Sequence, residues 1–190
     1  MMTSSSHKSG TDRCGEVVQS LEDKGLAYDV VVNLQGDEPF VDSKQIALLV
    51  DAFKNQSVEI ATLATRLRST EELLSPDNVK VVSGADSRAL YFSRQPIPYM
   101  RGTDVDRWVD EGAYYKHIGI YAFRTDTLRL LCQLEEAPLE KTEKLEQLRW
   151  LSAGYCIRVY ETDHANIGID TPADLAMAEA ILQKENNIKI

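Results

Sequence analysis

Cysteine is scarce in this chain, with only 3 among its 190 residues. Cys14, Cys132 and Cys156 are odd in number, lie far apart and show no CxxC or Cys/His metal spacing. This pattern does not fit the disulfide framework of a small secreted domain or a zinc site. It favours reduced, buried thiols in a cytoplasmic protein.

Positive charge and long apolar runs are also lacking. Lys and Arg number 21 against 30 Asp and Glu, which gives a net charge of −9. Nucleic acids and anionic membrane surfaces require clustered Lys and Arg, so we expect neither as a partner. Small anionic substrates need only a local cationic site. No apolar run reaches the length of a membrane span, and the N-terminus has no signal-peptide core, which again favours the cytoplasm.

The apolar content of 43% and charged content of 27% are typical of a folded globular domain, and we expect one α/β domain over residues 1–190. Apolar or alternating runs predict strands at 30–34, 58–64, 79–83, 89–93, 115–124 and 156–162. Apolar residues at helical spacing, together with capping residues, predict helices at 11–21, 43–53, 125–133 and 142–153, and a last helix from 171 onward. Residues 100–114 are charged and aromatic and show no helix or strand periodicity, which suits a flexible loop or a dimer arm.

The stretch Val30–Leu34 is β-branched and apolar, which predicts a strand buried on both faces. It is followed at once by Gln35, Gly36, Asp37 and Glu38. The carboxyl end of a strand in an open α/β sheet is where ligands bind, and carboxylates there suit a Mg²⁺ ion that carries phosphates. The alternative interpretation is ordinary turn chemistry after a strand.

A second carboxylate, Asp170, stands just before the helix start formed by Thr171, Pro172 and Asp174. It is therefore a candidate to face Asp37 across a metal ion, although an acid in a turn is the plain alternative. At the other end of the chain, Ser9, Gly10 and Thr11 begin a helix, where free N–H groups bind anions or a nucleotide's polar edge. A simple helix cap is the alternative there.

Candidates for a sugar site come from three further segments. Arg94 precedes two prolines and presents a planar fork suited to a carboxylate or phosphate, unless it is a solvated surface residue. His117 and Tyr121 lie on one face of the predicted strand 115–124. This face suits the binding of a sugar; the alternative is that His117 is a core residue with its hydrogen bonds satisfied inside the protein. Glu146 and Gln147 lie on a predicted helix and suit hydrogen bonding to a polyol or to water.

Six sequence motifs along the chain are more specific as an ordered set than any one of them alone. They are MTSSSHKSGTDR, VNLQGDEP, YFSRQPIPY, YKHIGIYAFR, EKLEQLRWL and NIGIDTPADL. In this order the chain closely resembles the 3-deoxy-manno-octulosonate (Kdo) cytidylyltransferases over nearly its whole length. The resemblance implies a Rossmann-like nucleotidyltransferase fold with a mixed sheet flanked by helices, a homodimer, and transfer of CMP from CTP to Kdo with release of pyrophosphate in lipopolysaccharide synthesis.

The resemblance also implies residue roles, with Mg²⁺ as the cofactor. Asp37 and Asp170 would be the metal ligands, and with Arg94 they would form the catalytic set. The implied nucleotide site is Ser9, Gly10, Thr11, Arg13 and Gln35. The implied Kdo site is Arg94, His117, Tyr121, Glu146 and Gln147.

One departure from the family pattern concerns residues 1–21. The family begins with a strand and a glycine-containing phosphate loop that carries an arginine and a lysine, and nothing in this stretch corresponds to it. We therefore expect the first βαβ portion to be missing, and a sheet edge either to be unpaired or to pair differently. Two alternatives stay open: another CTP- or UTP-dependent sugar nucleotidyltransferase, and a non-catalytic nucleotide- or sugar-binding remnant.

Overall fold

A computed structural model describes residues 1–36, 41–164 and 176 of the chain. Its helices are α1 (Gly10–Glu22), α2 (Ser43–Ala52), α3 (Thr70–Leu74), η1 (Val105–Arg107), α4 (Trp108–Glu111), α5 (Thr125–Leu131), α6 (Pro138–Glu143) and α7 (Gln147–Ser152). Its strands are β1 (Val30–Asn33), β2 (Ile60–Arg66), β3 (Lys80–Ser83), β4 (Ala89–Ser93), β5 (Tyr115–Arg124) and β6 (Ile157–Glu161). The predicted metal ligands Asp37 and Asp170 and the predicted last helix lie outside the described residues, apart from Ala176.

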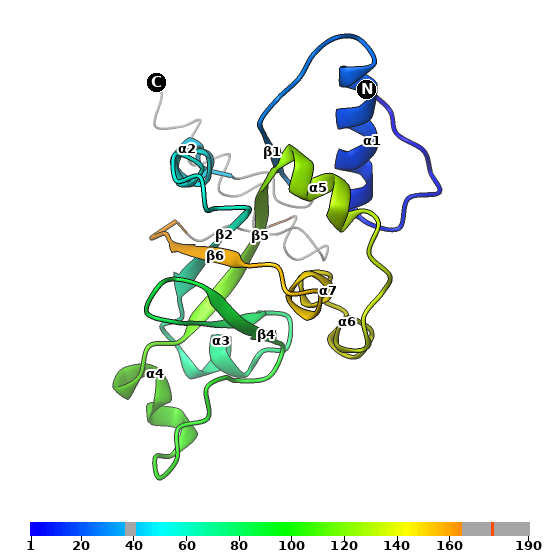
Figure 1. Cartoon of the computed structure of the whole chain (residues 1–190). Coiled ribbons are helices and arrows are strands. Elements are labelled where there is room, and N and C mark those ends of the chain that lie inside the picture. Colours follow the sequence, from blue (N-terminus) through cyan, green and yellow to red (C-terminus); the bar gives the residue numbers. More distant parts are fainter. Residues whose placement is uncertain (37–40, 165–175, 177–190) are drawn as a thin grey trace.

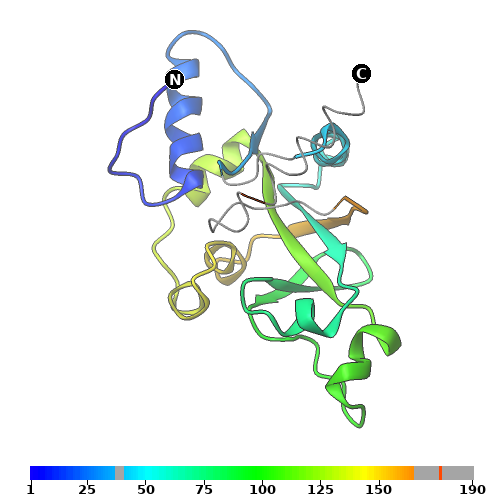
Figure 2. The same ribbon diagram turned by 180° about the vertical axis from the view of Figure 1, so that it is seen from behind.

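Strand β5 is the centre of a six-stranded mixed sheet, in which five strands have the order β4-β3-β5-β2-β6 and the sixth, β1, pairs with β5 off this path. It pairs with β2 along its length, with β3 near its start and with β1 near its end. Only β2 and β6 run parallel. Figures 1 and 2 show β5 running from the end of the molecule that carries α4 to the end that carries α1 and α5. The predicted mixed α/β sheet is confirmed.

The alternation predicted for β5 divides the core into two layers. Tyr121 and Phe123 face a cluster that includes residues of α1, α5 and α7. Ile118 and Ile120 face a second cluster, built with α2. Because side chains alternate across a strand, one ten-residue stretch supplies both layers. In the described part of the chain, no helix is both long and apolar enough to cross a bilayer.

A bulge interrupts β5 near the middle of the sheet. Thr62 of β2 lies opposite Tyr121, but the next residue, Leu63, lies opposite Ile118. Gly119 and Ile120 are therefore the extra residues on β5. Bulges bend a strand and redirect its side chains, and they are common beside active sites.

The strand β1 is less buried than the sequence predicted. Val30, Val31 and Val32 are only half-buried, and Leu34, which follows the strand, is 45% exposed. The prediction of burial on both faces was wrong because, among the described residues, β1 pairs with β5 alone and so forms an edge.

The predicted helix at 142–153 is in fact two helices. Lys144 adopts a left-handed conformation with φ of 56°, which ends α6, and α7 begins at Gln147. A non-glycine residue in this region is uncommon and stops helical hydrogen bonding. The break gives Glu146 and Gln147 a position at the start of a helix instead of its middle.

Residues 100–114 contain more structure than the sequence indicated. The segment forms η1 and α4, and Trp108 is 5% exposed and stacks on Tyr114 at a centroid distance of 5.9 Å. Leu67 and Leu73 complete this small cluster. The aromatic residues of the segment therefore form a satellite core, while a role as a dimer arm stays a prediction.

Candidate functional site

The start of α1 packs directly against the end of β1. A Cβ atom added to Gly10 would lie 3.1 Å from the side-chain amide nitrogen of Asn33, which is tighter than ordinary contact. Any larger residue at position 10 would require the Asn33 side chain to shift by a few tenths of an ångström. Asn33 itself is 9% exposed and lies opposite Tyr121 across the β1–β5 ladder. The predicted nucleotide-side helix start and the predicted sugar-side strand thus meet here.

Glu146 connects the two predicted halves of the site. The hydroxyls of Ser9 and Thr11 lie near its carboxylate and stabilise its charged form. Partial burial raises the pKa of Glu146, and the two hydroxyl donors counteract that rise. Ser9 also caps α1, because its Oγ accepts the backbone N–H of Asp12 at 3.1 Å. Ser9 therefore serves both as a helix cap and as a partner of Glu146.

Tyr121 lies within the same cluster, with its ring edge-on to Trp150 at 4.9 Å. Its side chain is buried, and its hydroxyl has no hydrogen-bond partner among the described residues. Burial, with a further contribution from the Glu146 carboxylate, raises the pKa of Tyr121 well above its usual value. An enclosed hydroxyl without a partner is costly, so a polar group that reached it would be bound favourably.

His117 is held by Thr62 on the neighbouring strand. The distance between His117 Nε2 and Thr62 Oγ1 is 3.0 Å, and the imidazole meets the ring of Phe92 edge-on at 5.0 Å. Burial lowers the pKa of His117 to about 3, so the ring is neutral at physiological pH. His117 and Tyr121 are neighbours, with ring centroids 5.2 Å apart, as their shared face predicted.

Gln35 reaches the bulge of β5 from the end of β1. Its side-chain amide donates to the Gly119 carbonyl at 3.2 Å. The contact joins positions 84 residues apart in the sequence and ties the segment before Asp37 to the strand that carries His117. Gln35 is exposed, so its other amide functions face solvent.

Arg94 is held by Glu143 and Pro76, and Gln147 directly follows Glu146. The guanidinium of Arg94 donates to the carbonyls of Glu143 and Pro76 at 2.9 and 3.0 Å, and its backbone N–H donates to the Glu143 carboxylate. Lys80, which is fully buried, donates to the Arg94 carbonyl. Gln147 is the first residue of α7 and is buried. The link to the rest of the site runs through Glu143, three residues before Glu146.

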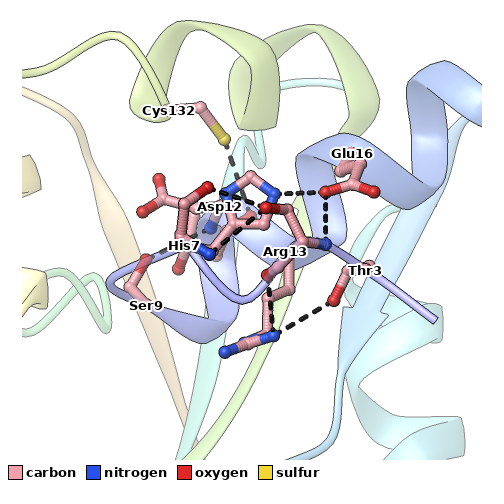
Figure 3. A network of polar contacts seen from close by, with 10 residues as sticks. Thr3, His7, Ser9, Asp12, Arg13, Glu16 and Cys132 are labelled. Carbon is pink, nitrogen blue, oxygen red and sulfur yellow. Dashed lines mark hydrogen bonds and ion pairs between the residues drawn. The ribbon is translucent and has the colours of Figure 1, made fainter.

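Arg13 is engaged with the N-terminal segment. Figure 3 shows its guanidinium pointing to Thr3, and it donates to the Thr3 hydroxyl and the Ser4 carbonyl at 3.1 and 3.2 Å. Glu16, one turn further along α1, binds His7. Residues 3–7 are therefore folded back along α1. Cys132 also approaches this helix, with Sγ 3.6 Å from the Thr11 carbonyl, and burial raises the pKa of its thiol to about 11.

Sequence reasoning missed three residues of this site. Asn33 ends β1 and contacts Gly10, Thr62 anchors His117, and Glu143 holds Arg94. Asn33 had a signal, because a polar residue closing an apolar strand often marks its functional end. Thr62 and Glu143 had none, since their partners are distant in sequence.

A cavity of about 140 Å³ lies apart from these residues, between the β3–β4 turn and the sheet. Tyr115, Glu161, Ser83 and Ser87 are among its lining residues, and none of the predicted site residues lines it. No cluster of three or more potential metal ligands occurs among the described residues. The predicted ligands Asp37 and Asp170 lie outside those residues.

Comparison with known proteins gives one consistent result. A family model described as cytidylyltransferase matches residues 1–162. A 3-deoxy-manno-octulosonate cytidylyltransferase of Parabacteroides distasonis is 46% identical over 186 residues, which cover 96% of this chain and 73% of that protein. The enzyme of the same description from Porphyromonas gingivalis is 47% identical over 188 residues, with 97% and 73% covered.

The solved structures agree. A CMP:2-keto-3-deoxy-manno-octonic acid synthetase complexed with CTP matches with a TM-score of 0.86 and 40% identity, over 97% of this chain and 72% of that one. A putative glucose-1-phosphate thymidylyltransferase from Bacillus anthracis shares the fold alone, with a TM-score of 0.56 and 16% identity. The chain belongs to the cytidylyltransferase family and, within it, to the 3-deoxy-manno-octulosonate cytidylyltransferases.

Proposed function

We propose that this chain transfers CMP from CTP to Kdo and releases pyrophosphate, as a step toward lipopolysaccharide. The observation that carries the proposal is the close approach of Gly10 to Asn33, which lies opposite Tyr121, because it joins the expected nucleotide side to the expected sugar side. The effect of the Ser9 and Thr11 hydroxyls on the Glu146 carboxylate agrees with it. Relatives at 46–47% identity with this activity in their names support it. The solved relative with CTP bound supports the nucleotide.

The reaction is an in-line displacement. The anomeric hydroxyl of Kdo attacks the α-phosphorus of CTP, a new P–O bond forms, the bond to the pyrophosphate oxygen breaks, and the hydroxyl proton passes to solvent. Such transfers depend mainly on positioning and on stabilising charge on the phosphate oxygens. The side chains that converge on β5 are suited to the positioning part.

Each side of the site has a distinct task in this proposal. The start of α1, with Ser9, Gly10 and Thr11, offers backbone N–H groups and hydroxyls to the cytidine, and Gln35 adds an amide. On the sugar side, the unpartnered hydroxyl of Tyr121 and the neutral ring of His117 provide hydrogen bonds to Kdo hydroxyls. Two N–H groups of the Arg94 guanidinium donate to the carbonyls of Glu143 and Pro76. The remaining N–H groups bind the negatively charged carboxylate of Kdo.

A Mg²⁺ ion belongs to the proposal on the chemistry of the donor set. Two carboxylates, Asp37 and Asp170, are hard oxygen ligands of the kind that Mg²⁺ prefers. When bound, the ion would neutralise negative charge on the CTP phosphates. Gln35 orients the segment that leads into Asp37 by its bond to Gly119. Homodimerisation and a cytoplasmic location are likewise proposals that the family resemblance supports.

Pyrophosphate release tests the function directly. The purified chain is incubated with CTP and Mg²⁺, with and without Kdo, and in parallel with UTP and Kdo. We expect release only when CTP and Kdo are both present. Release with UTP at a similar rate would indicate another sugar nucleotidyltransferase. Binding of CTP without release in any mixture would favour the non-catalytic remnant.

A further inference from the structure

Thr62 is a fully buried polar residue on β2 that no functional role yet explains. Its hydroxyl lies within hydrogen-bond distance of three groups, all on the bulged part of β5. These are the Ile120 carbonyl at 2.8 Å, the Ile118 carbonyl at 3.2 Å and His117 Nε2 at 3.0 Å. One side chain of β2 therefore contacts the bulge of β5 at two carbonyls and at the imidazole of His117.

The chemistry of these groups fixes their protonation. A carbonyl oxygen only accepts hydrogen bonds, so the single hydroxyl proton of Thr62 points to the two carbonyls. The oxygen of Thr62 then faces His117 Nε2 with a lone pair, and a favourable contact requires a hydrogen on Nε2. Because burial keeps the ring neutral, Nδ1 carries no proton and is an acceptor. Among the described residues, no hydrogen bond to Nδ1 occurs.

The same bulge also serves the nucleotide side. Gly119 is one of its two extra residues, and the Gly119 carbonyl accepts the side-chain amide of Gln35. The residues on both sides of Gly119, Ile118 and Ile120, have carbonyls near the Thr62 hydroxyl. Thr62 therefore fixes the backbone conformation at Gly119 through the residue before it and the residue after it.

We propose that Thr62 is a positioning residue for both substrates: it fixes His117 as the Nε2–H tautomer, so that Nδ1 accepts a sugar hydroxyl, and it shapes the bulge that holds Gln35. This role rests on the proposed function, since Thr62 acts on Kdo through His117 and on CTP through Gln35. A residue that only filled space in the core would influence stability and neither substrate.

Three variants separate these roles. Thr62→Val keeps the shape and removes the hydroxyl, Thr62→Ser keeps the hydroxyl, and Thr65→Val makes the same change on the same strand at a position opposite Lys116. We expect Thr62→Val to raise the KM for Kdo and for CTP and to lower kcat/KM by roughly 10- to 100-fold, the scale of sub-ångström misplacement. Thr62→Ser and Thr65→Val are expected to stay within about threefold of the unchanged chain, as substitutions that leave the positioning contacts intact.

Nitrogen-15 NMR of the His117 imidazole gives a readout that needs no turnover. The unchanged chain and Thr62→Ser should show a neutral ring protonated on Nε2, and Thr62→Val should show a mixture of tautomers. The proposal is overturned if Thr62→Val leaves the His117 signals and both KM values unchanged, or if Thr62→Ser behaves like Thr62→Val. If the unchanged chain releases no pyrophosphate, the proposed function fails, while the tautomer comparison still decides the role of Thr62 toward His117.

Discussion

The hydroxyl of Ser9 stabilises the charged carboxylate of Glu146, although 137 positions separate the two residues in the sequence. One residue caps the first helix, and the other precedes α7 after the break at Lys144. The contact brings the two substrate sides expected from the family motifs to one place. It also explains why the break between α6 and α7 matters, because a continuous helix would present Glu146 differently.

Replacing Glu146 with Gln tests this contact. The amide keeps one acceptor oxygen but loses the charge that the Ser9 and Thr11 hydroxyls stabilise, and a hydrogen bond to a charged group is worth about 1.5–3 kcal/mol. We therefore expect kcat/KM for both CTP and Kdo to fall by about tenfold or more, at about 1.4 kcal/mol per factor of ten. Steady-state kinetics with each substrate varied in turn provides the measurement. Glu135→Gln, an exposed change nearby in the sequence, is the control.

Arg94→Ala should affect Kdo far more than CTP. The proposed partner of the guanidinium is the Kdo carboxylate, and CTP lies on the other side of the site. The structure adds a loss of stability, because the side chain also donates to the Glu143 and Pro76 carbonyls. Binding of each substrate, measured by calorimetry on folded protein, checks the prediction. An equal loss of affinity for both substrates would count against the assigned role.

The stability of the chain should depend on His117 in mildly acidic solution. Burial lowers the pKa of His117 from 6.5 to about 3, so the unfolded chain binds this proton more tightly than the folded chain. The contribution of His117 is fully present above pH 6.5 and is lost as the pH falls toward about 3. The expected slope is about 1.4 kcal/mol per pH unit within that window.

Urea unfolding at pH 7, 5.5 and 4.5 measures this slope, and His117→Gln provides the comparison because its side chain does not titrate. The unchanged chain should lose stability faster than the variant as the pH falls. Glu146 acts with the opposite sign, since its pKa is raised, but it is common to both proteins and cancels in the difference. Equal slopes would show that His117 is not enclosed as described.

Asp37→Asn should abolish turnover and leave the fold intact. The change removes the charge of a proposed Mg²⁺ ligand and keeps the size of the side chain. Circular dichroism and melting temperature report the fold, and pyrophosphate release over a range of Mg²⁺ concentrations reports activity. Retained turnover at the Mg²⁺ dependence of the unchanged chain would remove Asp37 from the metal site.

The sequence predicted local structure well where one residue type has one clear consequence. The alternation of β5 and the helix start at Ser9 and Gly10 were both found as expected. These features depend on neighbours within four residues, which is the range over which propensity and capping act. The proposed roles of residues far apart in the sequence came from the family motifs, because local patterns carry no information on such residues.

The failures have a physical cause in common, which is tertiary context. The burial of β1 depends on how many strands pair with it, and Val30 to Val32 read the same in a central or an edge strand. Helix α6 ends at Lys144, which has a positive φ. The sequence has no glycine or asparagine at this position that would have indicated such a helix end. The bulge at Gly119 and its anchor Thr62 lie on different strands, so no spacing within the sequence predicts their contact.

Phosphorus-31 NMR of CTP provides the most direct measurement of the central claim. With the chain, Mg²⁺ and Kdo present, we predict that the α-phosphorus signal of CTP is replaced by a single phosphodiester signal, with one pyrophosphate formed for each CTP consumed. Without Kdo, the CTP signals should persist. Unchanged CTP in the presence of Kdo, or its conversion to free CMP in the absence of Kdo, would contradict the account.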